Sequence, residues 1–216
     1  MTYEDFIIDY IDQRGCGEPI FTEDLTPLVA DGFGLEEGKA QAAVSVAMKR
    51  ILDNEKVPDL RRYQRGIFYR TRKTAYGEIR IKKRMLIDRK YIQPDKGYET
   101  GVGLFYRMGL TTHIPNMRFI ATNAALAGTR YDKNLDITIC QPKTEITADN
   151  KEYLRTLDVL CQMDSIPYDA DHPYDIIGDF IDRSNLKYEK LLLYADRFYN
   201  QKTILRLGHV AGRKEA

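Results

Sequence analysis

The sequence predicts an α+β protein in two parts: a helical N-terminal part that ends in a basic hairpin, and a mixed, mainly helical C-terminal part with a small sheet. Two observations lead to this prediction. The hydrophobic pattern changes after Asn54 from a helical period to short strand-like runs. Charge changes at the same place, because residues 57–92 carry 12 basic and three acidic side chains, whereas the 216-residue chain has a net charge of only +1. Such a local excess of positive charge attracts polyanions.

The first helix is predicted to follow Thr2, a favourable N-cap residue, because the apolar side chains after it fall on one helical face. An extended stretch is predicted at residues 19–21. Thr22 is the predicted N-cap of a second, short helix, which a turn at residues 31–34 ends.

The third predicted helix has the most regular hydrophobic pattern in the chain. Its apolar residues recur every three or four positions, at Ala40, Ala43, Val44, Ala47, Met48, Ile51 and Leu52. The opposite face presents Lys39, Gln41, Ser45 and Lys49. The last three lie one turn apart, so they are candidates to contact base edges in a DNA major groove. The alternative is an ordinary amphipathic surface helix, whose polar face only meets solvent.

Two strand-like runs, residues 60–63 and 67–70, are joined by a turn that contains Gly66. Three helices followed by a basic hairpin are the element order of a winged helix-turn-helix, which we predict for residues 1–75. The basic side chains in and after this hairpin are candidates to contact a phosphate backbone: Arg61, Arg62, Arg65, Arg70, Arg72 and Lys73. The predicted partner is therefore double-stranded DNA.

Residues 76–96 are predicted to form a basic connecting helix or linker, with the helix over residues 79–91. Residues 97–216 are predicted to form a second domain. The elements expected in it are a helix at 98–108, strands at 117–122 and 135–141, and three helices at about 150–162, 172–184 and 186–200.

No catalytic residue, cofactor or metal site is predicted, so the chain is not expected to be an enzyme. The three histidines are isolated, Gly101–Gly103 lacks the third glycine of a dinucleotide fingerprint, and no phosphate-binding loop is present. An alternative is a metal-dependent nuclease built on Asp136, Lys143 and Glu145. Against it, Gln141 stands where an acidic metal ligand is expected.

No apolar run approaches the roughly 20 residues that a membrane span needs. Residues 1–5 are acidic, whereas a signal peptide begins with positive charge. We therefore expect a cytoplasmic protein with no membrane partner.

Several motifs resemble those of the AbiEi-type antitoxins of type IV toxin–antitoxin systems. In the second half these motifs are Tyr98–Gly101, Met108–Pro115, Phe119–Asn123, Gln141–Glu145 and Leu205–Gly208, and in the first half Pro19–Thr22 and Arg65–Tyr69. The resemblance spans most of the chain. It implies a winged-helix domain that represses the protein's own promoter, and a C-terminal domain that counters a co-encoded toxin of the nucleotidyltransferase type.

Three functions therefore remain open at the level of sequence. The first is a transcriptional repressor and antitoxin with no enzymatic activity. The second is a nucleic-acid nuclease that uses the winged helix as a targeting arm. The third is an interaction scaffold whose basic hairpin contacts an acidic partner. Sequence alone predicts neither the operator nor the oligomeric state.

Overall fold

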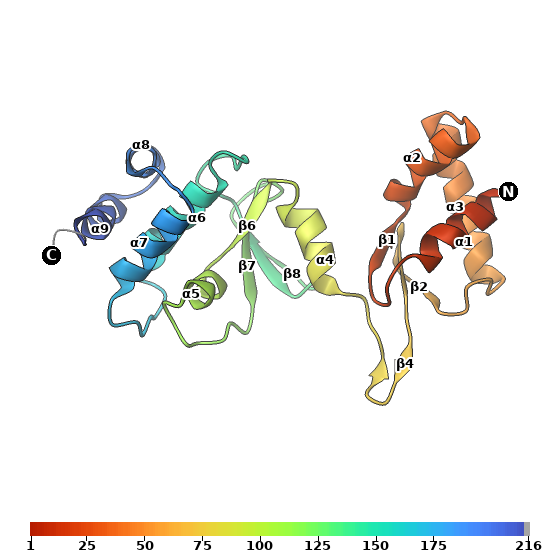
Figure 1. The fold of residues 1–216 in the computed structure, drawn as a ribbon, viewed down its shortest axis with the longest axis horizontal. Coiled ribbons are helices and arrows are strands. Elements are labelled where there is room, and N and C mark those ends of the chain that lie inside the picture. Colours follow the sequence, from red (N-terminus) through yellow and green to blue (C-terminus); the bar gives the residue numbers. More distant parts are fainter. Residues whose placement is uncertain (214–216) are drawn as a thin grey trace. The chain divides into compact units, whose positions relative to one another are not determined.

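The computed structural model describes residues 1–213, which form an α+β protein as predicted, with helices and small sheets. It divides into two compact units, unit 1 (Met1–Leu86) and unit 2 (Ile87–Ala216). Figure 1 shows the elements of each unit. Among the described residues, no helix has the length and apolar character needed to cross a membrane.

Unit 1 consists of helices packed on a small antiparallel sheet, with a second, shorter hairpin after it. Its elements are α1 (Tyr3–Asp12), β1 (Pro19–Phe21), α2 (Thr22–Phe33), α3 (Glu37–Asp53), β2 (Leu60–Gln64), β3 (Ile67–Arg70), β4 (Lys73–Thr74), β5 (Gly77–Glu78) and α4 (Lys83–Ile87), which runs across the unit boundary.

The start of α1 follows the prediction, whereas the start of α2 does not. Thr2 caps α1 in a reciprocal capping box, in which its hydroxyl accepts from the Asp5 N–H and the Asp5 carboxylate accepts from the Thr2 N–H. Thr22 is not the N-cap of α2, because it is the first helical residue and Phe21 holds the cap position. The Thr22 hydroxyl instead donates to the carbonyl of Gly66, which lies in the β2–β3 turn.

The sheet of unit 1 has the order β1-β3-β2, with both pairings antiparallel. The apolar stripe of α3 packs toward it and toward α1 and α2, so one core holds the three helices and the sheet together. Ile7, Ile20, Val44 and Phe68 bring a residue from each of α1, β1, α3 and β3 into this core. Burial of this stripe fixes which face of α3 remains exposed.

Residues 76–96 do not form one connecting helix. The chain first makes the β4–β5 hairpin, and the predicted helix over residues 79–91 begins only at Lys83. It continues as a π-helical turn, η1 (Asp88–Ile92). Ile81 is buried and the Lys82 N–H donates to the Gly17 carbonyl, so the residues before α4 belong to unit 1.

Unit 2 combines a four-stranded sheet with a group of helices. Besides η1, its elements are β6 (Gly97–Thr100), α5 (Val102–Met108), β7 (Arg118–Thr122), β8 (Thr129–Asp132), β9 (Ile137–Cys140), α6 (Lys151–Gln162), α7 (Pro173–Arg183), α8 (Tyr188–Phe198) and α9 (Gln201–Gly212). The sheet order is β6-β7-β9-β8, and only the β7–β9 pair is parallel.

The structure corrects three predictions in unit 2. The predicted helix at 98–108 is a strand, β6, followed by a shorter helix, because Gly101 adopts a positive φ of 70° that interrupts the chain between them. Strand β8 was missed, since its residues are exposed and carry no apolar alternation. A fourth helix, α9, follows α8 where three helices were expected; the Asn200 side chain caps it.

Candidate nucleic-acid interface

A groove of about 1170 Å³ lies in unit 1 between α2, α3 and the turn that joins β2 to β3. The residues that line it come from all three elements: Thr22, Glu23, Thr26, Pro27, Ala30 and Asp31 from α2, Glu37, Gly38, Gln41, Ser45, Met48, Lys49, Leu52 and Asp53 from α3, and Arg62, Arg65, Gly66 and Phe68 from the hairpin. The groove therefore brings residues far apart in the sequence onto one surface.

The exposed face of α3 forms one wall of this groove. Gln41, Ser45 and Lys49 all line it, as their one-turn spacing predicts. The Ser45 hydroxyl donates to the Gln41 carbonyl at 2.9 Å, so its proton is already committed within the helix. Lys39 is exposed but lies outside the groove, where its ammonium pairs with the Glu36 carboxylate at 3.3 Å.

Strand β2 and the β2–β3 turn form another wall, which presents Arg62 from the strand and Arg65 from the turn. Gly66 has a positive φ of 75°, and the strand register shifts between Arg62 and Gln64, so the turn is tight and irregular. The Thr22 N–H donates to the Gly66 carbonyl at 2.9 Å and ties the turn to α2. In the part of the chain that the structure describes, the side chains of Arg62, Arg65 and Lys49 have no hydrogen-bond or ion-pair partner.

Four carboxylates also line the groove, which sequence reasoning did not single out: Glu23, Asp31, Glu37 and Asp53. They contribute to the acidic character of the first 56 residues, where 12 acidic side chains outnumber five basic ones. Carboxylates repel phosphate, but they accept hydrogen bonds from the amino group of cytosine in the major groove. The helical walls of the groove therefore carry charges of both signs, whereas its hairpin wall carries the two positive charges of Arg62 and Arg65.

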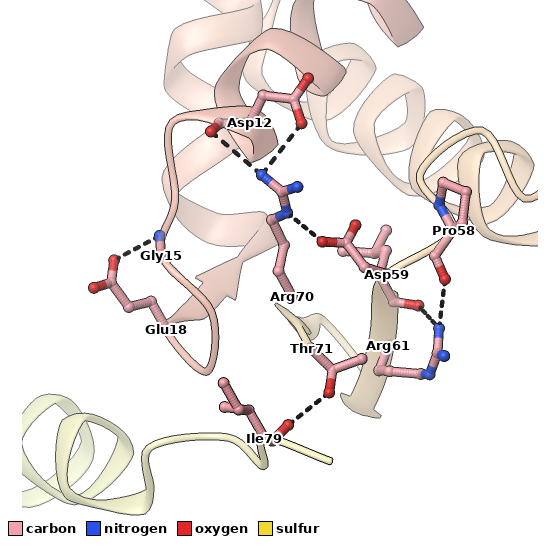
Figure 2. Close-up of polar contacts among 10 residues, drawn as sticks. Asp12, Gly15, Glu18, Pro58, Asp59, Arg61, Arg70, Thr71 and Ile79 are labelled. Atoms are coloured by element: carbon pink, nitrogen blue, oxygen red, sulfur yellow. Dashed lines mark hydrogen bonds and ion pairs between the residues drawn. The ribbon is translucent and has the colours of Figure 1, made fainter. Parts of the chain in front are cut away.

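Two of the predicted basic residues are held by internal contacts, and Figure 2 shows both. The Arg70 guanidinium donates from Nε to the Asp59 carboxylate at 2.9 Å and pairs with the Asp12 carboxylate at 3.3 Å. Arg61 donates to the carbonyls of Pro58 and Leu60, both at 2.9 Å. The structure therefore does not bring these two side chains into the groove.

Arg72 and Lys73 also lie outside the groove. Both are exposed, and Lys73 begins the β4–β5 hairpin, which continues past the end of the sheet where β3 finishes (Figure 1). The predicted set of ten residues is thus divided among the groove, the internal ion pairs, the start of α3 and a second hairpin.

Unit 2 contains a buried polar cluster around Asp158. Its carboxylate accepts from the hydroxyls of Tyr199 at 2.8 Å, Tyr98 at 3.0 Å and Thr100 at 3.2 Å. Burial raises the pKa of Asp158 above the ordinary value of 3.8, although these three hydroxyl donors oppose the shift. Both oxygens of the carboxylate accept a hydrogen bond. Because the donors come from β6 and from the end of α8, the cluster joins these two elements to α6.

The three residues of the nuclease alternative are not brought together. Asp136 precedes β9 and accepts from the Tyr131 hydroxyl at 2.5 Å, while Lys143 and Glu145 follow the other end of that strand. Among residues 1–213, no group of three or more His, Cys, Asp and Glu side chains is placed to hold a metal ion.

No protein-family model and no curated protein matches the chain. A solved structure, that of the RV2827C protein from Mycobacterium tuberculosis, resembles it with a TM-score of 0.47 and 12% sequence identity. The match covers 96% of this chain and 75% of that chain. A likeness this low adds nothing to the fold and the groove described above.

Proposed function

We propose that unit 1 is a winged helix-turn-helix module that binds double-stranded DNA. The observation that carries the proposal is the groove, which Gln41 and Lys49 of α3 line together with Arg62 and Arg65 of the β2–β3 hairpin. The element order supports it, because three helices and an antiparallel three-stranded sheet surround one core. In this arrangement α3 is the recognition helix and the β2–β3 turn is the wing.

The exposed face of α3 has the size that a recognition helix needs. A DNA major groove is roughly 12 Å wide and admits an α-helix with its side chains. Ala42 and Ser45 on this face are small and exposed, which allows the helix axis to approach the base edges. Gln41 has the side-chain amide that pairs with adenine, and Lys49 has the ammonium that donates to guanine.

Phosphate contacts are assigned to Arg62 and Arg65 because their guanidinium groups remain available. Such contacts set affinity and register, whereas base contacts set sequence preference. The proposed role is a cytoplasmic repressor that binds its own promoter, as the resemblance to AbiEi-type antitoxins implies. No chemistry catalysed by the chain itself enters this proposal.

Equilibrium binding of the full chain to duplex DNA tests the proposal. The DNA upstream of the protein's own gene is compared with a shuffled duplex of equal length and composition. We expect tighter binding to the upstream DNA, and loss of binding to both duplexes in the double variant Arg62→Glu with Arg65→Glu. Arg130→Glu is the control, because Arg130 is an exposed arginine of unit 2 that does not line the groove. Equal affinity of the double variant and the unmodified chain would remove the wing from the interface.

The second half of the proposed function, opposition to a nucleotidyltransferase toxin, is assigned to unit 2. Its only support is the resemblance, whose motifs include Tyr98–Gly101, at the end of β6 and the start of α5, and Gln141–Glu145 after β9. Growth with a co-encoded toxin induced, in the presence of the full chain, is the test. We expect the Arg62→Glu, Arg65→Glu variant to rescue growth although it has lost DNA binding. Failure of the unmodified chain to rescue growth would refute the antitoxin role and leave the DNA-binding role standing.

A further inference from the structure

The β4–β5 hairpin carries a tyrosine whose side chain does not pack against the rest of the protein. Tyr76, at the tip of this hairpin, is fully exposed, more so than any other large hydrophobic side chain among the described residues. A ring that contacts nothing in its own chain gains nothing in folding stability from its apolar surface. Its whole ring is therefore available to a partner outside the unit.

The tip holds Tyr76 in a defined place. Strands β4 and β5 pair Lys73 with Glu78 and Thr74 with Gly77. The Thr74 hydroxyl donates to the Gly77 carbonyl at 2.8 Å and accepts from the Tyr76 N–H at 3.2 Å. Gly77 has a φ of 112°, which only glycine adopts without strain, and it closes the turn.

The base of the hairpin is fixed to the rest of unit 1. The Thr71 hydroxyl donates to the Ile79 carbonyl at 2.7 Å, a contact visible in Figure 2, and the Ile79 N–H donates to the Arg72 carbonyl at 3.0 Å. Below it, the Lys82 N–H donates to the Gly17 carbonyl at 2.8 Å. The hairpin is thus already ordered in the folded protein, so a partner that binds its tip does not have to order it, and the entropy cost of binding is lower.

The charge around the hairpin favours a polyanion. Arg72, Lys73 and Arg80 are exposed cations on or beside it. The acidic side chain of the hairpin, Glu78, is paired with Arg61 at 3.4 Å, so its charge is partly compensated. An exposed aromatic ring among cations is the arrangement that binds nucleic acid, since the ring packs on sugars and bases while the cations neutralise phosphates.

We propose that the β4–β5 hairpin is a second DNA-contacting element, in which Tyr76 packs against the sugars and base edges of duplex DNA outside the segment bound by α3. This inference rests on the proposed function of the groove. The hairpin begins two residues after β3, and Figure 1 shows β4 beyond the ends of β1 and β2. Two residues outside any strand separate β3 from β4, so residues 67–74 span at most roughly 26 Å at about 3.3 Å each. At about 3.4 Å per base pair, the hairpin extends the footprint by at most roughly eight base pairs.

The experiment compares the full chain with Tyr76→Ala and Tyr76→Phe on a long duplex that contains the preferred site, by equilibrium binding and hydroxyl-radical footprinting. We expect Tyr76→Ala to bind roughly fivefold more weakly, because the variant lacks the apolar ring surface that contacts the sugars. It should also lose protection at the outer end of the footprint. Tyr76→Phe should retain both, because the ring carries the contact. Tyr168→Ala, an exposed tyrosine in unit 2, is the control.

The outcomes separate this inference from the proposed function. If Arg62→Glu with Arg65→Glu abolishes binding while Tyr76→Ala binds and protects like the unmodified chain, the groove binds DNA and the hairpin inference is wrong. If Tyr76→Ala weakens binding only to single-stranded DNA, the inference is also wrong. If the unmodified chain binds no duplex, the proposed function fails and the hairpin inference fails with it.

Discussion

Two pairs of arginines from the same ten-residue stretch have opposite surroundings. Arg62 and Arg65 line the groove and have no partner among the described residues, whereas Arg61 and Arg70 are bound by backbone carbonyls and carboxylates of unit 1. A run of positive charge is therefore not one functional surface. Alternation along β2 turns Arg61 and Arg62 toward opposite faces of the sheet, whereas Arg70 lies opposite Leu60, at the end of the sheet away from the Gly66 turn.

The largest effect we expect separates the two pairs by DNA affinity. Each phosphate contact contributes about 0.9 to the slope of log K against log salt. At about 50 mM salt, one such contact therefore strengthens binding roughly 15-fold relative to 1 M salt. Removing both guanidinium groups in Arg62→Ala with Arg65→Ala should therefore weaken binding about 200-fold and reduce the slope by about 1.8. A salt titration of the binding constant measures both quantities. An unchanged slope would show that the two side chains do not neutralise phosphates.

The second prediction concerns folding stability, to which Arg61 and Arg70 contribute through their internal contacts. Arg70 has a side chain only 24% exposed and links the end of α1 to the residue before β2. Its removal in Arg70→Ala leaves Asp59 without this partner, which we expect to cost about 1–3 kcal/mol in the free energy of unfolding. Urea denaturation measures it. Arg65→Ala is the control and should change stability by less than about 0.5 kcal/mol; equal losses in the two variants would contradict the distinction between the pairs.

The third prediction is that the α3 wall of the groove sets sequence preference, whereas the hairpin wall sets affinity for any duplex. Gln41→Ala should cost about 1–2 kcal/mol on the preferred duplex and much less on a shuffled one, because base contacts carry the sequence preference. Lys39→Ala, on the same helix but outside the groove, should change neither. Binding isotherms on both duplexes provide the measurement. Equal losses on the two duplexes would mean that Gln41 does not read bases.

Sequence patterns predict the elements whose residues alternate between core and solvent. The apolar stripe of α3 predicts that helix correctly. The one-turn spacing of Gln41, Ser45 and Lys49 predicts that they share a face, and all three line the groove. The acidic lining of the groove was not predicted. It depends on how α2 packs beside α3, which no local period encodes.

The misses share a physical cause. The β4–β5 hairpin has exposed residues throughout, so no hydrophobic alternation marks it, and its cations were assigned to the stripe of the first hairpin. Strand β6 is buried at every residue, so it lacks the alternation that distinguishes a half-buried strand from a helix. The ion pairs of Arg61 and Arg70 join residues that only the folded chain brings together.

The last prediction concerns the buried cluster around Asp158 in unit 2. Its polar groups are buried, whereas Gln41 and Lys49 in the groove are exposed. Asp158→Asn places an amide N–H₂ among three hydroxyl groups that donate to the carboxylate, which we expect to cost about 1 kcal/mol in the free energy of unfolding. Burial raises the folded-state pKa of Asp158, so the folded chain holds a proton on this carboxyl group more readily than the unfolded chain does.

That shift fixes the sign of the pH dependence. A raised pKa contributes stability that is fully present below the unfolded value of 3.8 and is lost as pH rises through the folded value. The stability advantage of the unmodified chain over Asp158→Asn should therefore narrow as pH rises from about 4, because only the carboxyl group must ionise in a buried place. Urea denaturation across this range measures the difference, with Asp179→Asn on the exposed face of α7 as control. An advantage that widens with pH would show that the three hydroxyl donors outweigh burial.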